Sequence, residues 1–337
     1  MSLKQIWGKI CPASKQQVNN QAKEVEQNLK KELAAQDRKM TRRLQKMDNN
    51  ANARLERIEK MLMMQYGGVT QKKRNKQIIV ALTSYPKRIY EVDTVIERFL
   101  NQTLKPDRVV LYLAEDNFPE GEAELPQRLL DMRNQGLEIH WCKQDIKSYK
   151  KLIPALLEYP DEIIITADDD IYYELDVVEN LYDSYRKFPK AVSALRVHKM
   201  NFEKDRILPY AKWNKCTSEI SNVPSMKLFA TTGGGTLFPP HVLYKDTTDE
   251  KLFTKLCPNA DDVWIKFMMV LNETPVVLAG NCVKIKCIDG TQEERLWDIN
   301  IQENDTQIQN VLRYYEDFRI EEKRIEAYLA ACDRDNN

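Results

Sequence analysis

Three consecutive aspartates, Asp168, Asp169 and Asp170, are the residues whose type and spacing point most directly to chemistry. They follow the apolar run at residues 163–166 by two positions, and an unbroken run of this kind fits a strand buried on both faces of an α/β sheet. Ligands of open α/β sheets bind at the carboxyl ends of the strands. Mg²⁺ and Mn²⁺ prefer oxygen ligands and complete their coordination shell with substrate phosphates. The pattern therefore predicts a D-x-D site for a metal and a diphosphate, made by Asp168 and Asp170, with a solvated acidic turn as the alternative.

Two other groups of polar residues are predicted at the same edge of the sheet. Hydroxyl, aromatic and basic side chains follow the first predicted strand, residues 78–82, and can hold a nucleotide base and its ribose. The candidates there are Thr83, Ser84, Tyr85 and Arg88. Lys150 and Lys151 stand at the beginning of the helix before the aspartate strand, from which they can reach phosphates. The alternatives are an ordinary turn for the first group and a solvated helix cap for the lysines.

Composition excludes several classes of protein. The 337 residues suffice for one large or two small domains, and 51 basic against 51 acidic side chains argue against a general nucleic-acid binder. No apolar run approaches the roughly 18 residues that cross a bilayer. Residues 1–14 carry charges where a secretory signal has its apolar core. The seven cysteines form no CxxC pair, which predicts reduced thiols in the cytosol, and the three histidines lack the spacing of a zinc site.

From residue 77 onward, strands are predicted to alternate with helices. The expected strands are residues 78–82, 108–113, 137–142 and 163–166, and the expected helices between them are residues 91–102, 125–135 and 149–158. This order predicts an α/β domain with a mainly parallel sheet and a Rossmann-like, nucleotide-binding first half.

The second half of the domain has a less regular pattern. The expected elements are a helix at residues 174–188, a strand at 191–198, an irregular insert at 201–226, a Gly-rich segment at 228–240, a helix at 259–272 headed by acids, strands within 274–288 and a last helix at 307–331. A long irregular insert in a compact domain is usually a functional loop.

The N-terminal part of the chain has a helical pattern of its own. Residues 16–65 contain no Gly and no Pro, which predicts one long helix. Apolar residues recur along it every 11 positions, and this period gives a straight or slightly right-handed coiled coil. The three rows are Val18, Leu29, Met40, Ala51 and Leu62; Ala22, Leu33, Leu44 and Leu55; and Val25, Met47 and Ile58.

These patterns divide the chain into four parts. Residues 1–15 form an amphipathic basic segment with Trp7, which can lie in a membrane interface or dock to a partner. Residues 16–66 are expected to be an oligomerisation stalk that forms a homo-oligomer, unless the helix packs back on the domain that follows. Residues 67–76 are a basic linker, and residues 77–337 are the catalytic domain.

Five segments, in order, resemble those of a known family. They are SYPKR at residues 84–88, YKKL at 149–152, TADDDIYY at 166–173, TGGGTLF at 232–238 and DDVWIKFMM at 261–269. Over residues 77–315 the chain resembles nucleotide-sugar glycosyltransferases of the GT-A fold. In particular, it is similar to bacterial capsule enzymes related to family 2, including the N-acetylglucosaminyltransferases of heparosan-type capsule synthesis. The stalk lies outside the resemblance.

The resemblance implies a UDP-sugar donor, Mn²⁺ or Mg²⁺, and transfer to a hydroxyl group of an oligosaccharide or lipid-linked saccharide. Asp170 is then the main metal ligand, and Asp168 lies nearer the ribose or a metal-bound water. The other donor contacts that it implies are Lys151, Asp169, Gly233, Gly234 and Gly235. Such enzymes often add a late histidine ligand, but no histidine follows His241, so that Asp289 or water would take its place.

The acid-headed helix is the place of the catalytic base in inverting members of the family. A carboxylate there deprotonates the acceptor hydroxyl, and either Asp261 or Asp262 occupies the position. The alternative is that both acids cap the positive N-terminus of the helix.

Two other functions are compatible with acids at the edge of an α/β sheet. A nucleotidyltransferase usually carries an early Gly- and Arg-rich phosphate loop, which the stretch after residues 78–82 lacks. A non-catalytic coiled-coil scaffold would not need the intact acids at 168–170 and 261–262. The expected location of the enzyme is the cytoplasm, with peripheral contact at the inner face of the cell membrane.

Overall fold

The computed structural model describes residues 12–203, 206–288 and 296–317. The chain divides into two compact units, Met1–Gln65 and Tyr66–Asn337. The amphipathic segment as far as residue 11, Asp289 and the part of the last predicted helix beyond residue 317 lie outside the described residues.

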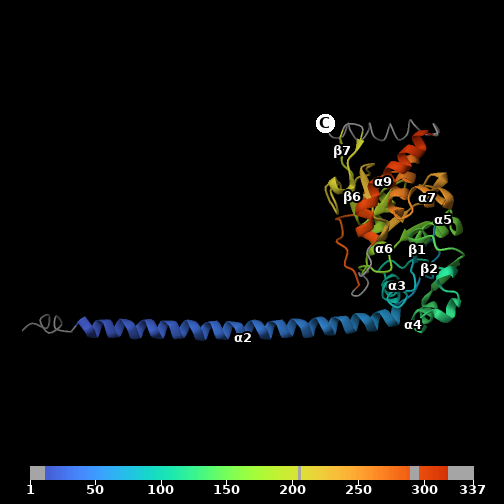
Figure 1. Cartoon of the computed structure of the whole chain (residues 1–337). Coiled ribbons are helices and arrows are strands. Elements are labelled where there is room, and N and C mark those ends of the chain that lie inside the picture. The colour runs from blue at the N-terminus through green and yellow to red at the C-terminus, as the bar shows by residue number, and fades with distance from the viewer. Residues whose placement is uncertain (1–11, 204–205, 289–295, 318–337) are drawn as a thin grey trace, which may run out of the picture. The chain divides into compact units, whose positions relative to one another are not determined.

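The described part of the first unit is helix α2 (Pro12–Tyr66), which Figure 1 draws as one uninterrupted element. The helix predicted from residue 16 is confirmed. Proline is tolerated in a first helical turn, because the N–H that it lacks has no partner there. At 1.5 Å per residue, the 55 residues span about 80 Å.

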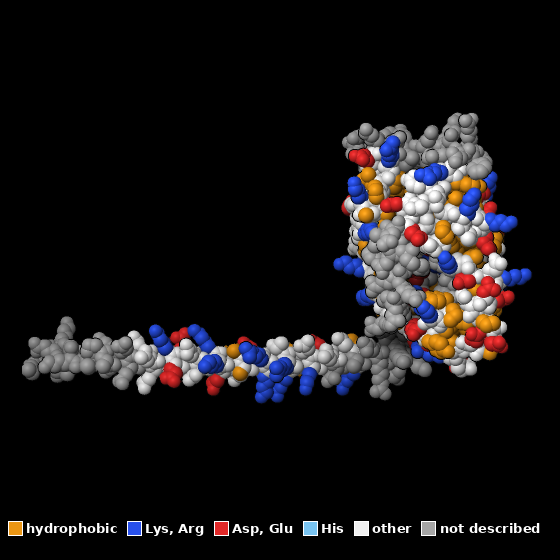
Figure 2. All heavy atoms as spheres, in the orientation of Figure 1, with side chains coloured by type: hydrophobic (Ala, Val, Ile, Leu, Met, Phe, Trp, Pro, Cys, Tyr) orange, Lys and Arg blue, Asp and Glu red, His pale blue; other side chains and the backbone are white. Residues whose placement is uncertain are grey.

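The surface of α2 combines charged and apolar side chains. Figure 2 shows many Lys and Arg side chains along it, with acidic and hydrophobic ones between. The large apolar side chains of the three rows that the structure describes are more than half exposed; Leu29 is 57% exposed, Leu44 54% and Leu55 63%. None of the described helices is both long enough and apolar enough to cross a membrane.

The second unit is organised around a seven-stranded sheet in the order β11–β5–β10–β4–β1–β2–β3. The strands are β1 (Ile78–Thr83), β2 (Arg108–Ala114), β3 (Leu137–Cys142), β4 (Ile163–Thr166), β5 (Val192–Ala194), β10 (Thr236–Phe238) and β11 (Val276–Leu278). Strands β1 to β4 are parallel to one another, and β11 is parallel to β5. Strand β10 runs antiparallel to both of its neighbours. The predicted mainly parallel α/β sheet is confirmed, and the first four strands begin and end within one residue of the expected positions.

Helices cover both faces of this sheet. They are α3 (Val92–Leu100), α4 (Gln127–Asp131), α5 (Ile153–Glu158), α6 (Val177–Lys187), α7 (Glu250–Leu256), α8 (Asp261–Leu271) and α9 (Leu296–Asp317). Successive residues of a strand point to opposite faces, so that Ile79 and Ala81 belong to one hydrophobic cluster, and Val80 and Leu82 to the other. Helices α5, α7, α8 and α9 contribute to the first cluster, and α3, α4 and α6 to the second. The unit therefore has three layers, with the sheet in the middle.

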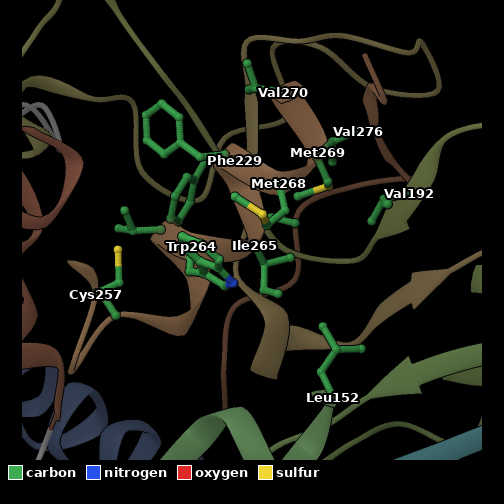
Figure 3. Packing of buried hydrophobic residues seen from close by; sticks show 14 of the residues in the cluster. Leu152, Val192, Phe229, Cys257, Trp264, Ile265, Met268, Met269, Val270 and Val276 are labelled. Carbon is green, nitrogen blue, oxygen red and sulfur yellow. The ribbon is translucent and has the colours of Figure 1, made fainter. Parts of the chain in front are cut away.

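Helix α8 is the most deeply buried helix of the first cluster. All of its residues from Val263 to Leu271 are buried. The Trp264 indole N–H donates to the carbonyl oxygen of Thr247 over 3.0 Å, and Lys266 Nζ donates to Leu228 O over 2.9 Å. Figure 3 shows side chains from α8, β9 (Leu228–Ala230) and β11 packed together, among them Trp264, Ile265, Met268, Phe229 and Val276. The start of α8 is thus anchored in the core.

Several predicted elements are divided in the structure. The helix expected at 125–135 is α4 followed by the 3₁₀ helix η3 (Met132–Gln135), and the one expected at 149–158 is η4 (Lys147–Lys151) followed by α5. Pro154, in the first turn of α5, explains the second division, because it cannot donate to a preceding helical turn. The strand expected at 191–198 is β5 and then β6 (Val197–Lys199), which pairs with β9 in a separate sheet.

The end of the domain also differs from the prediction. Within the described residues of 274–288, β11 is the one strand, and the β pairing outside it is an isolated bridge at Cys287. The chain turns after β11 at Gly280, which has a φ of +79°. Helix α9 begins at Leu296, before the predicted start at residue 307.

The insert at 201–226 is partly ordered by its aromatic side chains. It contains β7 (Phe202–Glu203), β8 (Arg206–Ile207) and η5 (Tyr210–Lys212). The rings of Tyr210 and Trp213 lie 5.0 Å apart, and Trp213 lies 5.2 Å from Phe229 of β9. The remaining short 3₁₀ helices are η1 (Glu115–Asn117), η2 (Gly121–Glu124), η6 (Thr232–Gly234) and η7 (Lys245–Thr248).

Candidate active site

The carboxyl ends of β1 and β4 lie side by side at one edge of the sheet. Ala81 of β1 is in register with Thr166 of β4, so the residues that follow both strands meet there. Ser84 Oγ donates to Asp169 Oδ2 over 2.6 Å, and Arg88 Nη1 donates to Asp169 Oδ1 over 2.8 Å. The predicted nucleotide segment and the aspartates are therefore in direct contact.

Asp169 is buried in this contact, and Arg88 is half-buried. Burial raises the pKa of Asp169, and Arg88 opposes that rise. Arg88 Nη1 also lies 3.0 Å from Asp170 Oδ2, and its guanidinium lies 5.6 Å from the centre of the Tyr85 ring. Burial lowers the pKa of Arg88, but the two carboxylates outweigh it, and the pKa is raised overall. The guanidinium thus stays charged between the two aspartates.

Lys151 links the aspartates to helix α8. Its Nζ lies 2.8 Å from Asp168 Oδ1 and 3.1 Å from Asp261 Oδ2, although the two acids are far apart in the sequence. The side chain of Lys151 is 4% exposed, and that of Lys150 is 2% exposed, so the solvated cap considered for this pair is wrong. Burial lowers the pKa of Lys151, but Asp168 and Asp261 raise it well above its ordinary value.

The two acids at the start of α8 face the Gly-rich segment. Asp261 Oδ1 accepts a hydrogen bond from Ser148 Oγ over 2.9 Å, and its Oδ2 accepts one from Thr232 Oγ1 over 3.1 Å. Asp262 Oδ1 accepts from the backbone N–H of Thr232 over 2.8 Å and from its hydroxyl. Ala260, the N-cap residue of α8, makes no side-chain capping hydrogen bond. The donors to both carboxylates therefore come from other segments.

Asp261 and Asp262 differ in their electrostatic surroundings. Burial raises the pKa of Asp261, but Lys151 and the hydroxyl donors outweigh it, so the pKa is lowered. Burial and the neighbouring Asp261 raise the pKa of Asp262 to about 6. Among the residues that the structure describes, no donor is hydrogen-bonded to Asp262 Oδ2. Asp262 is thus the more basic carboxylate and has one oxygen open to a further donor.

The Gly-rich segment lies directly against Asp168. The backbone N–H of Asp168 donates to the hydroxyl of Tyr173 over 2.8 Å, and that hydroxyl donates to the carbonyl oxygen of Gly233. Thr166 Oγ1 donates to the carbonyl oxygen of Thr232 over 2.7 Å. A Cβ atom on Gly233 would lie 1.7 Å from Asp168 Oδ2, so glycine is required there for this close approach.

Not every residue predicted for the site belongs to this network. Thr83 Oγ1 donates to the carbonyl oxygen of Tyr112 over 2.9 Å, toward β2. Lys150 pairs with Asp145 instead of reaching the aspartates. Gly234 packs against the Arg196 side chain, and Gly235 has a φ of +91°. In the described ranges, no three side chains of His, Cys, Asp or Glu are grouped so that they could hold a metal by themselves.

Three residues of the hydrogen-bond network were not among the site residues predicted from the sequence: Tyr173, Ser148 and Thr232. Tyr173 lies in the YY pair after the aspartates, and its burial and contacts depend on how the chain turns back. Ser148 precedes the YKKL segment, and Thr232 is the first residue of the TGGGTLF segment. Their hydroxyls could have been suspected only by asking which donors would satisfy buried carboxylates.

Comparison with known proteins identifies no family. No protein-family model and no curated protein matches the chain. Among solved structures, the chain is similar to S. aureus TarS 1–349, with 12% identity and a TM-score of 0.40 over 61% of this chain and 59% of that one. The same TarS fragment in complex with UDP gives a TM-score of 0.41 at 12% identity, with the same coverage of 61% and 59%.

A third structure covers more of the chain. The mannosyltransferase PcManGT from Pyrobaculum calidifontis, in complex with GDP-Man and Mn²⁺, has 12% identity and a TM-score of 0.43, over 81% of this chain and 77% of that one. The chain spans about three fifths of the length of the TarS structures. Similarity of this degree carries no conclusion about activity, which must rest on the residues of the site.

The contact between Gly233 and Asp168 predicts the effect of Gly233→Ala. The new Cβ must displace the Asp168 carboxylate from Lys151, which loses one of its two partners. Leaving a buried polar group poorly paired costs about 1–3 kcal/mol, so we expect a lower melting temperature. Calorimetry of a double-mutant cycle provides the control. In an Asp168→Ala background, Gly233→Ala should reduce the free energy of unfolding much less than in the wild type. An equal reduction in both backgrounds would show that the methyl group does not displace the Asp168 carboxylate.

Proposed function

We propose that this chain is a metal-dependent glycosyltransferase of the GT-A type, which transfers a sugar from a UDP-sugar to a hydroxyl group of a saccharide acceptor. The observation that carries the proposal is the buried Lys151, which holds Asp168 and Asp261 within 3.1 Å of its Nζ. Two groups of acids, one suited to a cation and the other to proton abstraction, are thereby fixed beside each other.

The charge of the network supports a bound cation. It contains five carboxylates (Asp168, Asp169, Asp170, Asp261 and Asp262) but two cations (Arg88 and Lys151), which leaves three negative charges when all groups are ionised. Hard divalent cations favour such oxygen donors and share them with phosphate oxygens.

The exposure of the three aspartates separates their roles. The side chains of Asp168 and Asp170 are 36% and 15% exposed, so their oxygens fit Mn²⁺ or Mg²⁺, with Asp170 as the main ligand. Asp169 is 8% exposed and instead positions Ser84 and Arg88. When bound, the cation stabilises the negative charge that develops on the leaving UDP.

The donor is held by residues around this cluster. Tyr85, half-buried beside Arg88, contacts the base and, with Ser84 and Thr83, borders the ribose. The segment from Gly233 to Gly235 receives the sugar, because it lies directly against Asp168 of the cation site. Lys151 positions Asp168 and Asp261, since both carboxylates already occupy its ammonium group.

Asp262 is the proposed catalytic base. Its pKa of about 6 lies nearer to neutrality than that of an ordinary aspartate, which favours proton abstraction at physiological pH. Its Oδ2 is the oxygen available to the acceptor hydroxyl. Asp261, whose two oxygens accept from Ser148, Thr232 and Lys151, positions the network.

We further propose that α2 assembles the enzyme into a homo-oligomer. The apolar rows of α2 would be an aggregation liability in water, and a second copy of the helix can bury them through the same 11-residue period. Several N-terminal segments on one particle would bind a membrane together more strongly than one alone. The assembly would then work at the inner face of the cell membrane, where lipid-linked saccharides are available as acceptors.

The metal role predicts the behaviour of Asp170→Asn. The change keeps the size of the side chain but removes a charged ligand, so kcat should fall roughly a hundredfold or more while the fold is retained. UDP release with a panel of UDP-sugars and saccharide acceptors measures kcat, and calorimetry measures UDP binding with Mn²⁺, which should weaken. Asp116→Asn, at an exposed aspartate of η1, is the matched control. Full activity of Asp170→Asn, or of the wild type in EDTA, would rule out the metal role.

The base assignment predicts a pH dependence. Asp262 must be deprotonated to act, so kcat of the wild type should be constant at neutral pH and fall as the pH decreases through about 6. Asp262→Asn should lower kcat by at least about a hundredfold and leave UDP binding unchanged. Asp261→Asn should lower the melting temperature more, because it removes one of the two charged partners of the buried Lys151. Equal, small losses of kcat at both positions would instead favour helix capping.

Oligomerisation through the stalk predicts that deleting it lowers the molecular mass of the particle and leaves the transferase activity intact. Deletion of residues 1–65 should give a monomer that still uses a soluble acceptor, and Leu44→Asp with Leu55→Asp should reproduce the monomer. Light scattering after size exclusion measures the mass against the 39.5 kDa of one chain. Lys46→Asp with Asn49→Asp, exposed positions outside the apolar rows, should leave the oligomer intact. A monomeric full-length protein would refute the role of the stalk.

A further inference from the structure

Two cysteines outside the proposed catalytic network lie with their sulfur atoms in contact. Cys216 Sγ and Cys282 Sγ are 3.0 Å apart, and both residues are half-buried. Cys216 belongs to the insert between β8 and β9, whereas Cys282 follows β11. The seven scattered cysteines were expected to be reduced thiols without a pattern, and their sequence positions do not reveal this pairing.

The backbone holds both cysteines in place. The N–H of Cys216 donates to His198 Nδ1 over 3.1 Å, and the N–H of Cys282 donates to Ser218 Oγ over 2.9 Å. Cys216 has a φ of +46°, a left-handed conformation that is unfavourable for a residue with a Cβ atom. Strain of this kind persists where the surrounding structure fixes it, and here it keeps the first thiol facing the second.

The pair connects the insert at 201–226 to residues that are hydrogen-bonded, through Leu195, to the Gly-rich segment. Val283, next to Cys282, donates from its backbone N–H to Leu195 O over 2.9 Å. Leu195 in turn donates to the carbonyl oxygen of Gly235 over 3.0 Å. On the other side, Cys216 follows the aromatic part of the insert that contains Tyr210 and Trp213. A covalent bond between the two sulfur atoms would therefore link the insert to the chain after β11, which is hydrogen-bonded through Leu195 to the Gly-rich segment.

We propose that Cys216 and Cys282 form a reversible intramolecular disulfide by exchange with a low-molecular-weight disulfide of the glutathione type. One cysteine thiolate attacks a sulfur atom of the small disulfide, forms a mixed disulfide and releases one thiol after protonation. The second cysteine attacks the protein sulfur of that mixed disulfide and releases the second thiol. Two protein thiols are oxidised and one small disulfide is reduced, so that electrons and protons balance.

The order of attack follows from the surroundings of the two thiols. Burial and the hydrogen bond that Cys282 donates to Cys216 raise the pKa of Cys282, which makes it the poorer initial nucleophile. Cys216 begins the exchange, and Cys282, already in contact with it, resolves the mixed disulfide. In a reducing cytosol the pair stays reduced, and oxidising conditions close it. This inference does not depend on the glycosyltransferase proposal.

The test uses the full-length protein incubated with oxidised glutathione. Free thiols titrated after denaturation should fall from the seven of the reduced chain to five. Peptide mapping by mass spectrometry without reductant should find the peptides of Cys216 and Cys282 joined, with no glutathione attached. The melting temperature should rise by several degrees and return after addition of dithiothreitol, because a cross-link restricts the unfolded chain.

Single substitutions test whether a disulfide between Cys216 and Cys282 causes these changes. Cys216→Ser and Cys282→Ser should each abolish the joined peptide and the rise in melting temperature. Cys142→Ser, at another half-buried cysteine, should leave both unchanged. Seven remaining thiols in the wild type, a different pair of joined peptides, or stable glutathione adducts at Cys216 without ring closure would each overturn the proposal.

Discussion

The buried ammonium group of Lys151 is the interaction on which the candidate site depends. Without it, Asp168 at the end of β4 and Asp261 at the start of α8 would face each other as like charges in a poorly solvated place. Removing one partner from such an ion pair is strongly destabilising, because the remaining charge stays buried. The lysine therefore determines both that the two elements can approach and how far apart their carboxylates are held.

The three aspartates are equivalent in sequence, but the structure gives them different surroundings. Asp169 points inward to Ser84 and Arg88 and is almost completely buried. The side chains of Asp168 and Asp170 remain partly exposed. Strand β4 ends at Thr166, and Asp169 and Asp170 lie in the turn that follows it, where the chain changes direction. One carboxylate can thus organise the end of the sheet, while the residues on either side of it remain accessible to a ligand.

Much of the fold and part of the site could be predicted from sequence. The strands β1, β2 and β4 were located because unbroken apolar runs identify buried strands. The burial of Lys150 and Lys151 was not predictable, since a lysine is buried only where its partners are, and those partners come from distant segments. The same holds for the hydroxyl of Tyr173 and for the contact between Cys216 and Cys282. Local pattern locates elements, whereas these pairings depend on tertiary packing.

The direction of β10 explains why the Gly-rich loop reaches the site at all. In a purely parallel sheet, the residues before a strand lie at the edge opposite to the ligand site. Strand β10 is antiparallel to β4, and Thr236 at its start is in register with Thr166 at the end of β4. The loop that precedes β10 is therefore delivered to the edge where the aspartates lie, and Gly233 meets Asp168 there. A single reversed strand thus lets a segment before a strand and segments after strands build one site.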